Sequence, residues 1–222
     1  HHVRELAGSK WENIYLNFIN NRNIWPRGLP LNSIFNKPKY LNRKINKEFY
    51  LQQGVCEGNP DVDAIFRLTN SKINVKFKNN LKFSLGQCLS PFNSQNTIWF
   101  KKIFPLMYLP VTCTMRATDI WRSLIALIIL KNDNKKILFF GTTMFQKRNE
   151  HNLTNDFEQE ITLYLNSNKI VELLKKVKIK KGEKNYFINL KKLYQVLIKN
   201  KIFLKDEIKY LEAWTEDCSK LI

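Results

Sequence analysis

The stretch that decides the fold is RATDIWRSLIALIIL, residues 116–130. Its second half is apolar on all sides, which is typical of a helix buried within a protein. Thr118 or Asp119 can cap the start of this helix, because a short oxygen-bearing side chain accepts hydrogen bonds from free N–H groups of the first turn. We therefore expect a buried helix over residues 119–130 that begins beside the polar residues 116–122.

Strands are predicted on the N-terminal side of this helix. Apolar and polar residues alternate over 73–77 and again over 81–85, with a turn at Asn79-Asn80, which predicts a β-hairpin. Within residues 1–48, Pro26, Gly28, Pro30 and Pro38 break helices and strands, so we expect irregular structure there and an exposed loop over 36–48. Shorter apolar segments predict strands over 49–55, 109–113 and 135–140 and a short helix over 94–104.

The C-terminal part changes to a helical pattern. Apolar residues at helical spacing predict a helix over 156–174 with a break near Asn166, and two more over 190–197 and 208–214. We therefore expect a mixed α/β (α+β) domain over residues 1–155 and a C-terminal helical subdomain over residues 156–222.

Composition bounds the partners and the compartment. A formal charge of +18 is compatible with an anionic partner. Lysine far outnumbers arginine, and asparagine and isoleucine are abundant, as an AT-rich genome produces by codon bias alone. We therefore expect scattered charge. A negatively charged sugar nucleotide is the next explanation of the positive charge, and nucleic acid is the third, supported by charge alone.

Cys56, Cys88, Cys113 and Cys218 show no metal-type spacing, which predicts free thiols in a reducing compartment such as the cytoplasm. The longest apolar run, 124–130, is too short to span a membrane.

Three polar runs lie far apart in the sequence, at 59–67, 91–97 and 116–122. The first and third combine acids and arginines with large apolar residues, and the second is a series of amides and hydroxyls between aromatic residues. Such groups suit a polyhydroxylated ligand, so a sugar is the first substrate class to consider. We expect the three runs to converge on one face.

The same runs carry a family resemblance. The segments WPRGLPL (25–31), PDVDAIFRLT (60–69), PFNSQNT (91–97), LPV (109–111) and TDIWR (118–122) resemble, in this order, the STELLO glycosyltransferases. The segments RNEH (148–151) and DFE (156–158) extend the resemblance. More distantly, residues 59–64 and 118–121 resemble the UDP-arabinopyranose mutases, which have a GT-A-like fold.

The resemblance implies a GT-A-like glycosyltransferase fold, a nucleotide-sugar donor, a carbohydrate acceptor and a divalent cation, Mn²⁺ or Mg²⁺. A eukaryotic STELLO-like protein would be associated with the Golgi. GT-A enzymes begin with alternating strands and helices that end in an Asp-x-Asp motif, and no such series precedes residue 60. The resemblance therefore implies either the acceptor-side half of the fold, as part of a larger enzyme, or a reduced relative of such enzymes.

Asp119 is the first candidate for a catalytic base, because inverting transfer needs a group that takes the acceptor proton. Asp61 and Asp63 match the Asp-x-Asp pattern of a metal site, yet they follow a turn signal and lie downstream of the family's metal motif. They are therefore candidates for a plain loop, for contact with a sugar or acceptor, and for metal binding.

The remaining candidates are substrate-binding residues. The arginines can hold phosphate or pair with the acids, and Trp121 can stack on a sugar or pack in the core. His151 is a candidate metal ligand or an ordinary loop residue. The substrate-binding candidates are Asp61, Asp63, Arg67, Asn93, Gln95, Asn96, Arg116, Trp121 and Arg122.

Two functions follow from these observations. The first is a glycosyltransferase-like domain that transfers a sugar from a nucleotide sugar to an acceptor. The second is a non-catalytic module that binds or scaffolds another glycosyltransferase.

Overall fold

The structure is a computed structural model that describes residues 3–8, 11–20, 23–36, 38–45, 48–70 and 73–221, with the backbone alone for 42–44. The apolar stretch forms α2, Thr118–Asn132, in which every residue from Ile120 to Leu130 is buried. The predicted buried helix is thus confirmed.

The predicted cap of this helix is wrong. Ala117 occupies the capping position, and no side chain caps the first turn. The Thr118 hydroxyl donates to the carbonyl of Met115, while the Asp119 carboxylate accepts hydrogen bonds from residues outside the helix. Tertiary partners have therefore replaced the local cap.

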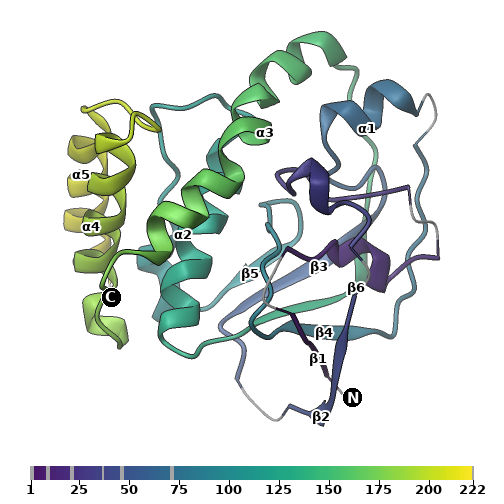
Figure 1. The fold of residues 1–222 in the computed structure, drawn as a ribbon, viewed down its shortest axis with the longest axis horizontal. Helices are drawn as coiled ribbons and strands as arrows, with labels where there is room; N and C mark the ends of the chain where they lie inside the picture. The colour runs from purple at the N-terminus through teal and green to yellow at the C-terminus, as the bar shows by residue number, and fades with distance from the viewer. Residues whose placement is uncertain are drawn as a thin grey trace.

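A six-stranded mixed sheet faces the helices (Figure 1). Its order is β2-β1-β4-β6-β3-β5, in which β3 and β6 are parallel, β1 and β4 are parallel, and the other pairs are antiparallel. The strands are β1 (Arg4–Leu6), β2 (Tyr40–Lys44), β3 (Leu51–Gly58), β4 (Lys82–Leu85), β5 (Thr97–Trp99) and β6 (Ile137–Gln146).

The strand predictions for 49–55, 81–85 and 135–140 are confirmed by β3, β4 and β6, whereas the hairpin is wrong. Residues 73–77 form no strand; Val75 makes an isolated antiparallel bridge with Gly58. Within the segments predicted to be irregular, β1 and β2 pair with each other, and β1 also pairs with β4. Whether these segments form strands depends on backbone partners from distant parts of the sequence, and the local alternation of apolar and polar residues does not show such partners.

Two further expectations are wrong. Residues 94–104 contain β5 and part of a 3₁₀ helix, η3 (Lys101–Met107), instead of one short helix. Residues 109–113 form no strand, because the backbone N–H groups of Val111 and Thr112 donate to the carboxylate of Glu207.

The C-terminal helices form as predicted, except that the first has no break. Asn166 lies inside a continuous helix and donates its side-chain N–H to the carbonyl of Thr162. The helices besides α2 are α1 (Ala64–Thr69), α3 (Leu153–Lys175), α4 (Tyr186–Lys199) and α5 (Glu207–Ser219), and the other 3₁₀ helices are η1 (Ile14–Asn17), η2 (Leu31–Ser33) and η4 (Glu183–Asn185).

Helix α3 crosses the molecule between the sheet side and the C-terminal helices, and it packs against both α1 and α2 (Figure 1). Helices α4 and α5 lie side by side at one edge. Buried residues of the sheet, α2, α3, α4 and α5 join one apolar cluster, and the division at residue 155 stays a prediction. All four cysteines are free thiols. Among the described residues, none of the helices combines the length and apolarity of a membrane span.

Candidate functional site

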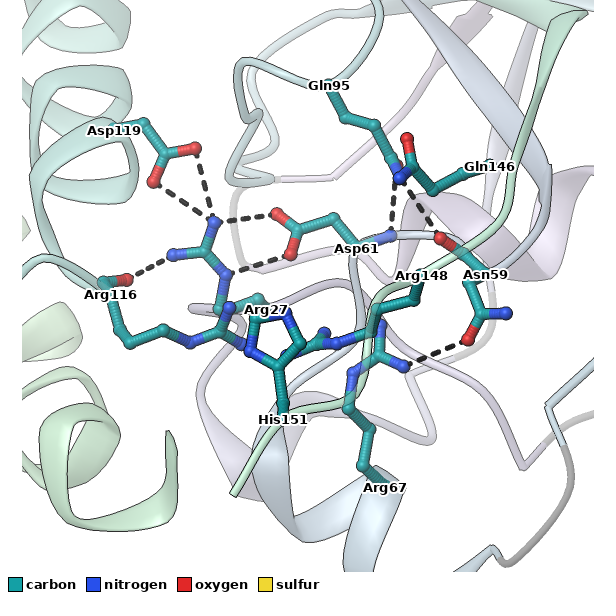
Figure 2. A pocket seen from close by; sticks show the side chains of 10 residues that line it. All are labelled: Arg27, Asn59, Asp61, Arg67, Gln95, Arg116, Asp119, Gln146, Arg148 and His151. Atoms are coloured by element: carbon teal, nitrogen blue, oxygen red, sulfur yellow. Dashed lines mark hydrogen bonds and ion pairs between the residues drawn. The ribbon is translucent and has the colours of Figure 1, made fainter. Parts of the chain in front are cut away.

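A cavity of about 250 Å³ lies where the three polar runs meet (Figure 2). The turn at 26–28, the loop at 59–61, the loop at 91–97, the start of α2 and the segment after β6 all contribute side chains to it. The predicted convergence of the three runs is therefore confirmed. The lining residues are Arg27, Asn59, Asp61, Arg67, Gln95, Arg116, Asp119, Gln146, Arg148 and His151.

Arg27 joins the two carboxylates of the cavity (Figure 2). Its Nε and Nη2 donate to the two oxygens of Asp61 at 2.9 and 2.8 Å, a bidentate arrangement. The same Nη2 lies 3.1 and 3.2 Å from the oxygens of Asp119, and Nη1 donates to the carbonyl of Arg116. Burial alone would lower the pKa of Arg27, but Asp61 and Asp119 raise it above its ordinary value. Although burial opposes it, Arg27 holds the pKa of Asp61 below its usual range.

The backbone next to Arg27 fixes this arrangement. The Arg27 N–H donates to the carbonyl of Asp61 at 3.0 Å. Gly28 has a φ of +83°, and a Cβ there would lie 2.2 Å from the side chain of Ile120 in α2. Only glycine accommodates this φ together with this close approach, so the turn can seat Arg27 against the start of α2.

Two more arginines pair with acids from α3 behind the cavity. Arg116 donates to Glu160, which is fully buried and also accepts from the N–H of Ala64 at 2.7 Å. Arg148 donates to Asp156, which is buried as well. These ion pairs fix the two guanidinium groups at the cavity wall.

Arg67 differs from the other three arginines. Its residue is 5% exposed, and it donates to the side chain of Asn59 at 3.2 Å and to the carbonyl of Pro60 at 2.8 Å. Within the described part of the chain it has no carboxylate partner, and its Nε is buried without an acceptor. Burial and the nearby Arg148 lower its pKa to about 10. The charge of Asp61 raises the pKa of Arg67, but by less than burial and Arg148 lower it. A buried cation that no carboxylate contacts directly is costly, so this position favours a bound anion.

Asp63 points away from the cavity. It is fully buried and caps α1 by accepting from the N–H of Phe66 at 2.8 Å, and its other oxygen accepts from Trp25 Nε1 at 2.6 Å. Burial raises its pKa to about 6. The structure thus gives Asp63 a structural role.

Four other candidates also lie outside the cavity lining. Trp121 is 2% exposed and packs edge-on against Phe203, so it belongs to the core. Arg122 stacks on the ring of Trp99 at 4.9 Å and donates to Ser94. The other two side chains hydrogen-bond to strand β3. Asn93 accepts from the side chain of Gln53, and Asn96 donates to the carbonyl of Val55.

Gln95 lines the cavity and also shapes it. Its side chain accepts from the N–H of Asp61 at 3.1 Å and donates to the carbonyl of Asn59 at 3.0 Å. The amide-rich run therefore holds the loop at 59–61 in place.

The cavity does not fit a metal held by the protein alone. The described residues contain no group of three His, Cys, Asp or Glu side chains placed to bind one ion. His151 lies 3.7 Å from Asp156, and both oxygens of Asp61 and of Asp119 face the guanidinium of Arg27.

Sequence reasoning missed four lining residues: Arg27, Asn59, Gln146 and Arg148. Arg27, Asn59 and Arg148 lay inside the quoted motifs or polar runs but were not selected as site residues. A search for arginines next to a glycine in a turn would have found Arg27. Gln146 carries no signal of its own, because it reaches the cavity through its position at the end of β6.

A mixed α/β domain with a polar cavity between its elements is compatible with a glycosyltransferase domain. Residues 116–222 match the family model of the STELLO glycosyltransferases. "Probable glycosyltransferase STELLO2" and "Probable glycosyltransferase STELLO1" of Arabidopsis thaliana are each 25% identical over 213 residues, which is 92% of this chain and 27% of the relative. The resemblance to the STELLO glycosyltransferases is thus confirmed. The chain spans about a quarter of the length of the curated relatives it matches.

Proposed function

We propose that this chain is a glycosyltransferase-like domain whose arginine-lined cavity holds the diphosphate of a nucleotide-sugar donor. The observation that carries the proposal is Arg67, a buried arginine without a carboxylate partner among the described residues. Three further arginines line the same cavity. Arginine suits this task because its planar group offers several donors that match phosphate oxygens.

The donor groups that remain free support a phosphate ligand. The buried Nε atoms of Arg67 and Arg148 have no acceptor within the described chain. A phosphate oxygen would supply one, and its negative charge would compensate Arg67. The relation to the STELLO glycosyltransferases makes a nucleotide sugar the natural source of that diphosphate, and a carbohydrate the natural acceptor.

Asp119 is the proposed base. Its side chain is 14% exposed, and its carboxylate accepts from Arg27 and from the N–H of Ser94 at 3.1 Å. These contacts orient the carboxylate at the cavity edge. In an inverting transfer, Asp119 would take the proton of the acceptor hydroxyl. The oxygen of that hydroxyl would attack the anomeric carbon of the donor sugar, and the nucleoside diphosphate would leave. A placed base contributes roughly 10²–10⁴-fold.

The GT-A-like fold, the acceptor-side assignment and the divalent cation stay predictions of the resemblance. Mn²⁺ or Mg²⁺ would neutralise charge on the leaving diphosphate. The four arginines that line the cavity would neutralise part of the same charge.

Binding of pyrophosphate, measured by isothermal titration calorimetry, tests the anion site without knowledge of the nucleotide. Arg67→Met is expected to weaken binding by at least about tenfold, because a hydrogen bond to a charged group contributes about 1.5–3 kcal/mol. Lys147→Met removes one charge from an exposed residue outside the lining and is expected to change the affinity less than about twofold. Equal losses in both variants, or no binding to the unaltered chain, would refute the proposal.

A non-catalytic module is the second candidate. It is favoured by one observation: Arg27 contacts both carboxylates of the cavity, so neither is a free base in this state. Pyrophosphate binding together with no sugar transfer from any nucleotide sugar tested would favour this candidate.

A further inference from the structure

A second cavity, of about 440 Å³, lies at the opposite end of α2 from the arginine-lined cavity. Asp119 and Lys131 stand twelve residues apart on this helix, which places the two sites roughly 18 Å from each other along its axis. The end of α2, the end of α3 with the segment after it, and the turn at 87–89 form the walls. A volume of this size is typical of sites for small molecules.

The lining combines an apolar wall with hydrogen-bond donors. The apolar wall consists of Leu89, Ile128, Leu174, Val177 and Ile179. No acid is among the lining residues. The polar lining residues are two amides and two lysines, namely Gln87, Asn132, Lys131 and Lys175. The side-chain nitrogen of Asn132 is buried and has no acceptor within the described chain.

Lys131 is the central cation of this second cavity. Its Nζ donates to the carbonyl of Gly86 at 3.0 Å, and that is the only acceptor the described residues give it. An ammonium group has three N–H donors, so two are left over. Its pKa is lowered to about 8, chiefly by burial and also by the charges of Lys175 and Lys136, against the opposing effect of Cys88.

The helix alone does not account for this arrangement. A lysine in the last turn of a helix interacts favourably with the helix dipole, and an exposed side chain would suffice for that. The ammonium group of Lys131 instead lines a cavity together with five apolar side chains, a second lysine and an amide whose nitrogen has no acceptor within the described chain. Unpaired donors next to an apolar wall are complementary to one kind of molecule.

We propose that this second cavity binds a small amphiphilic anion, with a carboxylate or phosphate head held by Lys131, Lys175 and Asn132 and an apolar body along Leu174 and Ile128. Lysine acts as a point charge and does not distinguish the two head groups by geometry. The apolar body sets this ligand apart from a free phosphate ion and from the donor proposed for the arginine-lined cavity.

The test is calorimetric titration of the chain with four probes, all below the concentrations at which they form micelles. Decanoate and decyl phosphate have both head and tail, 1-decanol has the tail alone, and inorganic phosphate has the charge alone. We expect at least one of the two anionic amphiphiles to bind about tenfold or more tightly than both 1-decanol and inorganic phosphate. The stronger of the two identifies the head group.

Three variants locate the binding. Lys131→Met is expected to weaken the preferred amphiphile at least about tenfold while leaving 1-decanol unchanged, because it removes the charge and keeps the length of the side chain. Val177 is half-buried at the edge of the cavity, and Val177→Trp is expected to abolish the binding of both the preferred amphiphile and 1-decanol. Lys178→Met, at an exposed lysine one residue away, serves as the charge control and is expected to bind as the unaltered chain does.

The proposal is overturned if all four probes bind equally, if none binds, or if Lys178→Met weakens binding as much as Lys131→Met. Melting temperatures of the variants show that they are folded. Should Lys131→Met fail to fold, Lys131→Arg, which keeps the charge, is expected to retain binding while Val177→Trp abolishes it, and retained binding in Val177→Trp overturns the proposal. Pyrophosphate binding is expected to be unchanged in all these variants, so failure here is separable from failure of the proposed function.

Discussion

Arg27 and Asp63 show how one residue's neighbours decide its role. Both sit in short motifs of the family resemblance. The sequence left Asp63 open as a plain loop residue, a contact of a sugar or acceptor, or a metal ligand, and it did not single out Arg27. In the structure Asp63 is enclosed by Trp25 and the start of α1, whereas Arg27 reaches the cavity and holds Asp61 and Asp119 together. Composition alone does not distinguish these outcomes.

Asp119→Asn is expected to affect mainly sugar transfer, and Asp63→Asn mainly stability. Asp119→Asn keeps one acceptor for Arg27 and Ser94 but loses a charge-assisted bond, so stability is expected to fall by about 1–2 kcal/mol. Losing the base is expected to lower sugar transfer at least about tenfold. Asp63→Asn places an amide N–H toward Trp25 Nε1, so its expected effect is mainly on stability, about 2–4 kcal/mol.

Denaturant unfolding and sugar transfer from nucleotide-sugar donors separate the two effects. If Asp119→Asn transfers sugar at the full rate, Asp119 has only a structural role.

Glu12 is expected to make stability depend on pH. Glu12 is 5% exposed, and its Oε2 is buried without a hydrogen-bond partner among the described residues. Burial raises its pKa from 4.5 to about 7, against the effect of Lys39. A raised pKa in the folded state contributes stability below about pH 4.5 that is lost as the pH rises through about 7. Glu12→Gln removes this titration.

The loss of stability between pH 5 and pH 8, measured by urea unfolding, is therefore expected to be smaller in Glu12→Gln by about 1 kcal/mol or more. Identical pH profiles for the variant and the unaltered chain would show that Glu12 titrates normally.

At the scale of elements, one buried acid attaches α5 to the body of the domain. Glu207, in the first turn of α5, is fully buried and accepts from the N–H groups of Val111 and Thr112 and from the hydroxyl groups of Tyr108 and Thr112. These bonds hold the segment that was predicted to be a strand. The carboxylate of Glu207 accepts the backbone hydrogen bonds that the carbonyl groups of a neighbouring strand would otherwise accept.

Glu207→Ala is expected to destabilise the chain by about 3 kcal/mol or more, because it leaves buried donors without an acceptor. Glu212→Ala, on the same helix, removes an exposed ion pair with Lys191 and is expected to cost less than about 0.5 kcal/mol. Thermal unfolding of both variants checks this difference. Similar melting temperatures would mean that α5 contributes little to the stability of the domain.

At the scale of the molecule, arginine and lysine are distributed differently. Four arginines gather in one cavity, whereas exposed lysines occur at separate places, among them Lys101, Lys147 and Lys205 and the run at 175–181. A nucleic-acid interface needs a continuous basic surface with aromatic residues. The arrangement supports the view that most of the lysines reflect composition.

Random duplex DNA is therefore expected to bind weakly. Electrophoretic mobility shifts seen at low salt are expected to disappear at about 150 mM salt, since diffuse charge is screened and the release of counterions from the DNA favours binding less at higher salt. A shift that persists at this salt concentration would instead point to an organised nucleic-acid surface.

The sequence by itself determined the elements whose pattern is dense and local. The buried helix α2 and the three C-terminal helices follow from apolar spacing, and the relation to the STELLO glycosyltransferases follows from motifs in a fixed order. It also indicated which polar runs meet, because acids and arginines beside large apolar residues must find partners.

Only the tertiary structure decided the features that depend on contacts between segments far apart in the sequence. Strands β1 and β2 exist because each offers the other a row of backbone partners, and neither carries a strong pattern of its own. The division of the polar residues into cavity lining and hidden support, with Arg27 in the first group and Asp63 in the second, depended on contacts more than thirty residues apart in the sequence. Burial and pairing are properties of the assembled core, so no local pattern could report them.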